Sequence, residues 1–254
     1  MRISRDHGLR IRYLIHSVRP LTGTHAFSLV FPGLIFPDSD TICPWTYLAL
    51  LRLRSALSQL PASTTEKAAF TIIYKPYQLY PAAPQEGEDK YTWYKKTRYR
   101  DSDELMQKYT HVMGSYGEKE GIHFKFGGVV ANTSHAHRLI QHFQQEKGPE
   151  VADKIVRSLY RQYFEEERHP SSDETLLRAA TEAGVDEEEA KAFVTNKQLG
   201  LREVEMAVRE QAGNQVDAVP FVVIEGKRRD LSLEGAKEVG EYVAALEKVA
   251  KESS

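Results

Sequence analysis

The stretch SDTICPWTYL, residues 39–48, decides the fold, because it contains the start of the clearest predicted helix. The apolar residues that follow it are spaced by three and four positions: Leu50, Leu53, Leu57 and Leu60. This spacing predicts an amphipathic helix over residues 44–60, with Pro44 in its first turn and Pro61 at its end. Cys43 is therefore predicted to stand at a helix N-terminus.

The composition is that of a globular protein without a general affinity for nucleic acid or membranes. Of 254 residues, 41% are hydrophobic and 28% are charged, and the formal net charge is -2. A chain of this length can bury a core without disulfides or metal ions. Its charge offers no broad basic surface for nucleic acid or anionic lipid. No run of about 18 apolar residues predicts a membrane span.

The single cysteine excludes a disulfide within the chain, so the usual sign of a secreted protein is missing. We therefore expect a cytoplasmic, reducing environment. Residues 1–26 are expected to form a poorly ordered N-terminal extension. This extension contains several arginines against one acidic residue, Asp6: Arg2, Arg5, Arg10, Arg12 and Arg19. The pattern loosely resembles a transit peptide, which leaves organelle targeting as the alternative.

Two short apolar runs precede the helix, AFSLVF at 26–31 and GLIF at 33–36, and either is a candidate for the first strand. After the helix, AAFTIIY at 68–74 is rich in residues that favour strands and stops before Pro76. Together these elements predict a βαβ half over residues 27–100.

A second half, of ββα type, is predicted over residues 214–254. VPFVVIEGKRR at 219–229 contains a buried strand and a turn, and a weaker, polar strand should follow. A last helix is predicted next, with Ser232 as its cap. Its inner face is predicted from apolar residues at helical spacing: Ala236, Val239, Val243, Leu246 and Ala250.

Between the two halves, residues 101–213 contain several helical patterns and no convincing strand. Examples are ANTSHAHRLIQHF at 131–143 and PEVADKIVRSLYRQYF at 149–164. The order of these pieces predicts an α/β, thioredoxin-like fold with a large all-helical insertion.

In this order, the pieces resemble the DsbA-like thioredoxin-fold family, in its FrnE-type branch, from about residue 34 to 250. The segments that carry the resemblance are SDTICPW at 39–45, YQLYP at 77–81, NTSHAHRL at 132–139, LYRQYF at 159–164 and VDAVPFVVIEG at 216–226. The resemblance implies that Pro220, preceded by Val219, is a cis-proline that faces Cys43.

Thr46 departs from the family pattern, since most relatives of this type have a second cysteine there and their dithiol cycle depends on it. Two related groups with this fold, the kappa-class glutathione transferases and the hydroxychromene carboxylate isomerases, work with a serine and no second thiol. The resemblance therefore implies a monothiol enzyme with glutathione as its cofactor. It favours transferase or isomerase chemistry on a small conjugated molecule, in a setting such as polyketide-type secondary metabolism. A glutathione-coupled disulfide oxidoreductase and a non-catalytic binding protein remain alternatives.

Cys43 and Thr46 are the predicted catalytic residues. A helix N-terminus stabilises a thiolate, so Cys43 is expected to be more acidic than an isolated cysteine. The Thr46 hydroxyl is placed to donate a hydrogen bond to the sulfur. Pro44 and Trp45, together with Val219 and Pro220 from the resemblance, are expected to bind substrate or glutathione. The alternative is a buried and inert cysteine.

KYTWYKKTRYR at 90–100 interleaves aromatic and basic residues. Lys95 and Arg98 are candidates for a local anion site that binds carboxylates of glutathione or substrate. A solvated loop and a nucleic-acid contact are the alternatives.

His135 and His137 are two positions apart, which on a helix places them on different faces, so we expect no metal site there. Both are predicted to be surface or capping residues. Asn132 and Thr133 are predicted to cap the helix that follows, and a substrate contact is the alternative for Asn132. The expected partners are glutathione and a small-molecule substrate, and a homodimer is left open.

Overall fold

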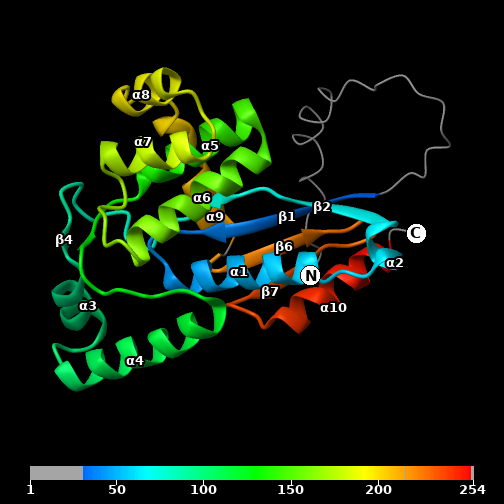
Figure 1. The fold of residues 1–254 in the computed structure, drawn as a ribbon, viewed down its shortest axis with the longest axis horizontal. Coiled ribbons are helices and arrows are strands. Elements are labelled where there is room, and N and C mark those ends of the chain that lie inside the picture. Colours follow the sequence, from blue (N-terminus) through cyan, green and yellow to red (C-terminus); the bar gives the residue numbers. More distant parts are fainter. Residues whose placement is uncertain (1–30, 215, 253–254) are drawn as a thin grey trace.

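The computed structural model describes residues 31–214 and 216–252 (Figure 1). Its main sheet has the strand order β2-β1-β6-β7, and β3 also pairs with β1. The strands of this sheet are β1 (Phe31–Ser39), β2 (Ala68–Ile72), β3 (Lys75–Pro76), β6 (Phe221–Glu225) and β7 (Leu231–Glu234). The helices that lie next to these strands in the sequence include α1 (Pro44–Ser58), α2 (Ala62–Thr65) and α10 (Val239–Glu252).

Strand β1 is the centre of the sheet and belongs to the predicted βαβ unit. It pairs in parallel with β2, with Leu34 opposite Thr71, and antiparallel with β6, with Ile35 opposite Ile224. Parallel neighbours need a crossover, which α1 provides. GLIF lies within β1, whereas AFSLVF falls outside the described residues except for Phe31.

Helix α1 confirms the helix predicted from the leucine spacing and ends two residues earlier, at Ser58. Leu48 and Leu53 are almost completely buried, and truncating such a side chain to alanine costs about 2–5 kcal/mol. Leu57 and Leu60 lie at the edge of the core. Helix α1 packs against α10 (Figure 1).

The predicted cap of the last helix is wrong. Ser232 lies in β7, where it pairs with Val223 of β6, and α10 begins only at Val239. The alternating sequence LSLE forms a strand beside β6, and Gly235, at a φ of 76°, turns the chain away from it. The polar strand itself was predicted correctly.

The chain between β3 and β6 is mostly helical, which confirms the helical insertion. Its helices are α3 (Lys90–Arg98), α4 (Asp103–Glu120), α5 (Ser134–Lys147), α6 (Pro149–Phe164), α7 (Asp173–Glu182), α8 (Glu187–Thr195) and α9 (Leu201–Gly213). In Figure 1, α5 to α8 gather on one side of the sheet while α3 and α4 form a separate pair. A two-stranded sheet of β4 (Glu88–Asp89) and β5 (Val129–Val130) was not predicted.

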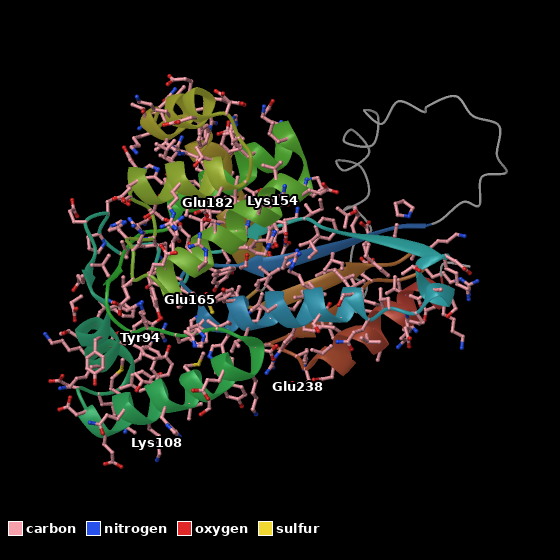
Figure 2. All side chains as sticks on the ribbon, in the orientation of Figure 1. Tyr94, Lys108, Lys154, Glu165, Glu182 and Glu238 are labelled. Atoms are coloured by element: carbon pink, nitrogen blue, oxygen red, sulfur yellow. The ribbon has the colours of Figure 1, made fainter. Side chains whose placement is uncertain are left out.

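The segment with Lys95 and Arg98 is a helix, so the solvated-loop interpretation is wrong. Asp89 caps α3 by accepting a hydrogen bond from the backbone N–H of Thr92 at 2.9 Å. The side chain of Tyr94 is buried against the helices around it (Figure 2). The missed signal is Asp89, a residue type that favours the N-cap position, directly before this segment.

The insertion is joined to the sheet and to α1 by polar contacts. The backbone N–H of Tyr74 donates to Gln144, and the Tyr74 hydroxyl donates to Asp153 of α6. Tyr47 of α1 donates to Glu165, just after α6, at 2.8 Å (Figure 2). Within residues 31–214 and 216–252, no helix has the length and apolar character needed to cross a membrane.

Candidate active site

The turn between β1 and α1 positions Cys43. The backbone N–H of Cys43 donates to the carbonyl of Asp40 at 3.1 Å, which closes the turn. Cys43 is the N-cap residue of α1, with φ -91° and ψ 115°, and it makes no side-chain cap bond. Its side chain therefore stands beside the free N–H groups of the first helical turn, as predicted.

Pro220 faces Cys43 from the start of β6, as the family resemblance implied. The Val219–Pro220 peptide bond is cis. The Sγ atom of Cys43 lies 3.8 Å from the carbonyl oxygen of Val219, and the thiol donates this hydrogen bond. A protonated thiol can donate such a bond and a thiolate cannot, so the contact suits a neutral Cys43.

Burial makes Cys43 less acidic, so the expectation of an acidic thiol is wrong. The residue is 3% exposed, and burial raises the pKa of its thiol to about 11. The backbone N–H groups of Thr46 and Trp45 lower the pKa, and the carboxylate of Asp40 raises it. The helix terminus acts in the predicted direction, but loss of hydration outweighs it. At neutral pH Cys43 is a thiol, not a thiolate.

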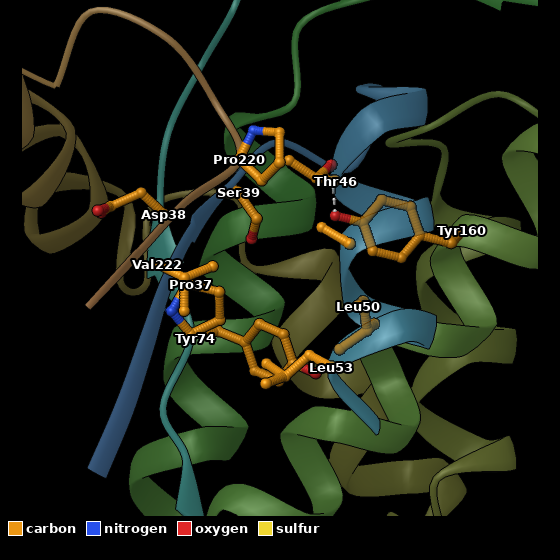
Figure 3. A pocket seen from close by; sticks show the side chains of 11 residues that line it. Pro37, Asp38, Ser39, Thr46, Leu50, Leu53, Tyr74, Tyr160, Pro220 and Val222 are labelled. Carbon is orange, nitrogen blue, oxygen red and sulfur yellow. Dashed lines mark hydrogen bonds between the residues drawn. The ribbon is translucent and has the colours of Figure 1, made fainter. Parts of the chain in front are cut away.

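The Thr46 hydroxyl bonds mainly to backbone carbonyls of the turn and only weakly to the sulfur of Cys43. Its Oγ1 lies 2.9 Å from the carbonyl oxygen of Asp40 and 2.7 Å from that of Cys43. It also accepts a hydrogen bond from the Tyr160 hydroxyl at 2.8 Å (Figure 3). The hydroxyl proton of Thr46 already has these carbonyl acceptors, so the predicted hydrogen bond to the sulfur is weak. The Thr46 side chain accordingly lowers the pKa of Cys43 less than the backbone N–H groups do.

Asp40 and His137 form a buried pair that the sequence analysis missed. Asp40 is 0% exposed and His137 is 1% exposed, and Nε2 of His137 lies 3.5 Å from Oδ1 of Asp40. The other carboxylate oxygen accepts a hydrogen bond from the backbone N–H of Leu79 at 2.7 Å. The assignment of His137 to the surface or to a cap is therefore wrong, because α5 turns this residue toward the active-site turn. His135 is half-buried.

Asn132 caps α5, as predicted. Its Oδ1 accepts from the backbone N–H of Ser134 at 2.9 Å and from the side chain of Gln78 at 3.1 Å. Its Nδ2 donates to the carbonyl of Pro81 at 2.8 Å. Thr133 occupies the N-cap position without a side-chain cap bond, so its predicted capping role is wrong. The amide of Asn132 is occupied by contacts within the protein.

Tyrosines surround the thiol on several sides. Burial raises the pKa of each, and a charge on Cys43 would raise each further: Tyr77, Tyr80, Tyr94, Tyr109 and Tyr160. Trp45 is more exposed, at 37%, and packs edge-on against Tyr116 with ring centroids 5.3 Å apart. The surroundings of Cys43 that the structure describes are therefore mainly aromatic, with the carboxylate of Asp40 acting on the thiol.

Behind the active-site turn lies a small cavity (Figure 3). Its lining includes Thr46, Leu53, Tyr74, Tyr160 and Pro220, and its volume is about 10 Å³. A space of this size holds about one water molecule. The cavity is therefore too small to hold a substrate.

A second cavity, also about 10 Å³, lies between Pro44 and the α3–α4 pair. Lys90 lines it and is 4% exposed, with its Nζ 4.2 Å from the centroid of the Tyr163 ring. Burial lowers the pKa of this amine to about 8. Lys90 was not among the predicted site residues, because nothing in its sequence context distinguishes it from a surface lysine.

The two predicted anion-binding residues are placed differently. Lys95 is paired with Asp103 at 2.7 Å, so its charge is already balanced. Arg98 donates to the hydroxyl of Tyr80 at 2.9 Å and 3.1 Å. In the part of the chain that the structure describes, no carboxylate lies within ion-pair distance of Arg98. Arg98 thus contacts Tyr80, one of the tyrosines around Cys43, whereas Lys95 is paired with Asp103.

Among residues 31–214 and 216–252, no cluster of three His, Cys, Asp or Glu side chains has the geometry of a metal site. Asp40 and His137 approach each other to 3.5 Å, and two such side chains do not make up a metal site.

Comparison with solved structures finds the same fold. A probable DsbA oxidoreductase from Streptomyces coelicolor is 25% identical, with a TM-score of 0.74 over 87% of this chain and 91% of that one. A 2-hydroxychromene-2-carboxylate isomerase is 15% identical, with a TM-score of 0.60 over 86% and 96%. The cytosolic disulfide reductase DsbM from Pseudomonas aeruginosa, solved with GSH, is 14% identical, with a TM-score of 0.55 over 86% and 96%. The last two likenesses show the fold alone.

Among curated proteins, none matches this chain. The family model described as DSBA-like thioredoxin domain matches residues 39–247. The matched span begins at the active-site turn, contains the helical insertion and includes the cis-proline and most of α10. The chain therefore belongs to the DSBA-like thioredoxin domain family.

Proposed function

We propose that the protein is a glutathione-linked enzyme in which glutathione supplies the reacting sulfur for transferase or isomerase chemistry on a small conjugated molecule. One observation carries this proposal: Cys43 is a neutral thiol that donates a hydrogen bond toward Val219. The chain has no second cysteine that could complete a dithiol cycle.

A neutral thiol is a poor nucleophile but a usable hydrogen-bond donor. In the proposed complex, the sulfur of glutathione lies beside Cys43 and accepts a hydrogen bond from its S–H group. The N–H groups at the start of α1 add to this stabilisation of a glutathione thiolate. Cys43 then has the role that a serine has in the related glutathione-dependent enzymes.

The remaining residues are assigned by their positions around this sulfur. The backbone of Val219, before Pro220, is proposed to pair with the extended tripeptide, as peptides pair with a strand edge. Arg98 is proposed to bind a carboxylate, because its guanidinium is held by Tyr80 and not by an acidic residue. Pro44 and Trp45 would form the apolar wall against which a conjugated substrate lies.

In the proposed isomerase reaction, the glutathione thiolate adds to a conjugated double bond and forms a carbon–sulfur bond. The resulting single bond rotates, and expulsion of the same thiolate restores the double bond, so no net proton or electron is consumed. In the proposed transfer reaction, the carbon–sulfur bond stays and the substrate takes up a proton from water. The aromatic surroundings of Cys43 favour a flat, conjugated substrate of polyketide type.

A second candidate is a monothiol disulfide oxidoreductase, favoured by the position of Cys43 opposite the cis-proline. Cys43 would attack a disulfide, one thiolate would leave, and glutathione would release the mixed disulfide. Both candidates use glutathione, which points to a reducing compartment such as the cytoplasm. A non-catalytic binding protein is the third alternative.

Activity of the Cys43→Ser and Cys43→Ala variants separates these functions. The assay follows conjugation of glutathione to a generic aryl halide and isomerisation of a cis-enone. If Cys43 is a donor, Cys43→Ser keeps most of the activity and Cys43→Ala loses it. Disulfide exchange would instead be abolished by both variants, and intact mass after treatment with oxidised glutathione would show one adduct on the wild type. A non-catalytic protein would show neither.

A further inference from the structure

The Asp40–His137 pair has no assigned role in the proposed chemistry. Both side chains are almost completely excluded from water, and Nε2 of His137 has no hydrogen-bond partner apart from its 3.5 Å approach to the Asp40 carboxylate. Burying a carboxylate is costly unless donors or opposite charge compensate it. The backbone N–H groups of Ile42 and Leu79 each donate to the Asp40 carboxylate, and His137 is the side chain placed to compensate its charge further.

The position of the pair connects the insertion with the thiol of Cys43. Asp40 begins the turn that Cys43 closes through its backbone N–H. His137 lies in the first turn of α5, within the helical insertion. The carboxylate of Asp40 thus lies between the N-terminus of α5 and the turn that holds Cys43.

We propose that His137 is a positioning residue that sets the acidity of Cys43: by donating to Asp40, it weakens the negative potential that the carboxylate imposes on the thiol. Without this donor, the thiolate of Cys43 would face an uncompensated negative charge and would form less readily.

The charges around the site favour this assignment. The titratable groups that face Cys43 from the segment after β3, from α3, from α4 and from α6 are phenols whose pKa is raised: Tyr77, Tyr80, Tyr94, Tyr109 and Tyr160. Burial and the charge of Asp40 both raise the pKa of Tyr163 in α6, so this phenol is neutral as well. Arg138, next to His137, points to backbone carbonyls of Phe193, Asn196 and Leu199. Asp40 is the charged group that acts on the thiol, and it raises the pKa of Cys43.

The inference takes from the proposed function only that Cys43 is the active-site thiol, and its test does not involve glutathione. The rate of alkylation of Cys43 by iodoacetamide is measured as a function of pH in the full chain. The variants are His137→Leu, Asp40→Asn and the double variant. Gln78→Met is the matched control, because Gln78 donates a hydrogen bond to Asn132, just before α5, but carries no charge.

At a fixed pH below the midpoint of the profile, we expect His137→Leu to react about tenfold more slowly, which corresponds to a midpoint about one unit higher. Asp40→Asn should react faster. In the double variant the effect of His137→Leu should vanish, because no carboxylate remains to be compensated. His137→Gln, which keeps an N–H donor, and Gln78→Met should both stay close to the wild type.

A purely structural role of His137 would give a different pattern. In that case His137→Leu and Gln78→Met would change the rate alike, or the effect of His137→Leu would be the same with and without Asp40. Either result overturns the inference. If His137→Leu does not fold, as judged by circular dichroism, His137→Asn takes its place, since asparagine is too short to reach Asp40 and carries the same expectation.

Discussion

The thiol of Cys43 donates a hydrogen bond to the carbonyl oxygen of Val219, with 3.8 Å between sulfur and oxygen. The acceptor belongs to the residue before cis-Pro220, and the strand that follows, β6, pairs with β1 at the centre of the sheet. Cys43 is thereby held as a buried, protonated thiol between α1 and the start of β6. The predictions below follow from this state and from the groups that maintain it.

The raised pKa of Cys43 predicts a specific loss of stability at alkaline pH. Burial raises the pKa from an ordinary 9.0 to about 11, so the folded state holds the thiol proton more tightly than the unfolded state. The resulting contribution is fully present below the unfolded pKa and is lost as pH rises toward the folded pKa. The wild type should therefore lose about 2–3 kcal/mol more than Cys43→Ser over this range.

Chemical denaturation of both proteins at several alkaline pH values measures this difference. The tyrosines titrate in both and cancel in the comparison. Parallel stability curves for the two proteins would show that Cys43 is not buried as a thiol.

Asp38 gives a prediction at acidic pH. Burial raises the pKa of this carboxyl to about 6, and its Oδ1 has no hydrogen-bond partner. Its contribution to stability is therefore present below the ordinary pKa of 3.8 and is lost as pH rises through about 6. Asp38→Asn should be more stable than the wild type at neutral pH, by up to about 2 kcal/mol, and the advantage should disappear at low pH. Thermal melts at neutral and low pH test this, and equal stability at both contradicts it.

Thr46→Val should weaken the active-site turn. The substitution keeps the shape but removes the hydroxyl that bonds to the Asp40 and Cys43 carbonyls and accepts from Tyr160. Leaving buried polar groups unpaired costs about 1–3 kcal/mol. Urea denaturation at neutral pH measures the loss. Thr65→Val, which removes an exposed hydroxyl that bonds to the Ala62 carbonyl, is the control and should change stability little.

Thr46→Cys should add dithiol chemistry. The position is adjacent to Cys43 in the helix turn, and a second thiol there supplies the resolving group that the chain lacks. We expect reduction of insulin disulfides to rise above the wild-type rate, and conjugation activity to fall under oxidising conditions as an internal disulfide forms. A variant that folds and gains no disulfide reduction would show that the turn cannot support exchange.

Arg98→Ala should weaken glutathione binding, whereas Lys95→Ala should not. Arg98 faces Tyr80 with no acidic partner among the described residues, and Lys95 is already paired with Asp103. Titration calorimetry with reduced glutathione measures both. Loss of one charge-assisted contact corresponds to about 1.5–3 kcal/mol, and equal affinities for the two variants would remove Arg98 from the site.

The fold was largely readable from the sequence because its signals are local. The leucine spacing of α1 and the apolar runs of β1, β2 and β6 each depend on a few neighbouring residues. The cap of α10 was misplaced because Ser232 is a good cap by type, and only the pairing of LSLE with β6 puts it in a strand.

The site was less predictable because its electrostatics depend on burial and on distant segments. The helix N-terminus at Cys43 was apparent from Pro44, but the desolvation that outweighs its effect comes from burial of the thiol in the folded chain. Likewise, Asp40 and His137 are almost one hundred positions apart, and only the folded chain brings them within 3.5 Å. The sequence identifies His137 as a titratable residue on a predicted helix, but it does not identify Asp40 as its partner.

The most direct test of the central claim is the acidity of glutathione bound to Cys43→Ser. This variant contains no protein thiol, so the ultraviolet absorbance of its glutathione complex reports the glutathione thiolate once the phenolate background of the free protein is subtracted. We predict that the bound thiol titrates below the ordinary value of about 8.5, and that this decrease is lost in Cys43→Ala, which has no donor at this position. Bound glutathione that titrates alike in both variants, or that binds to neither, would contradict the account.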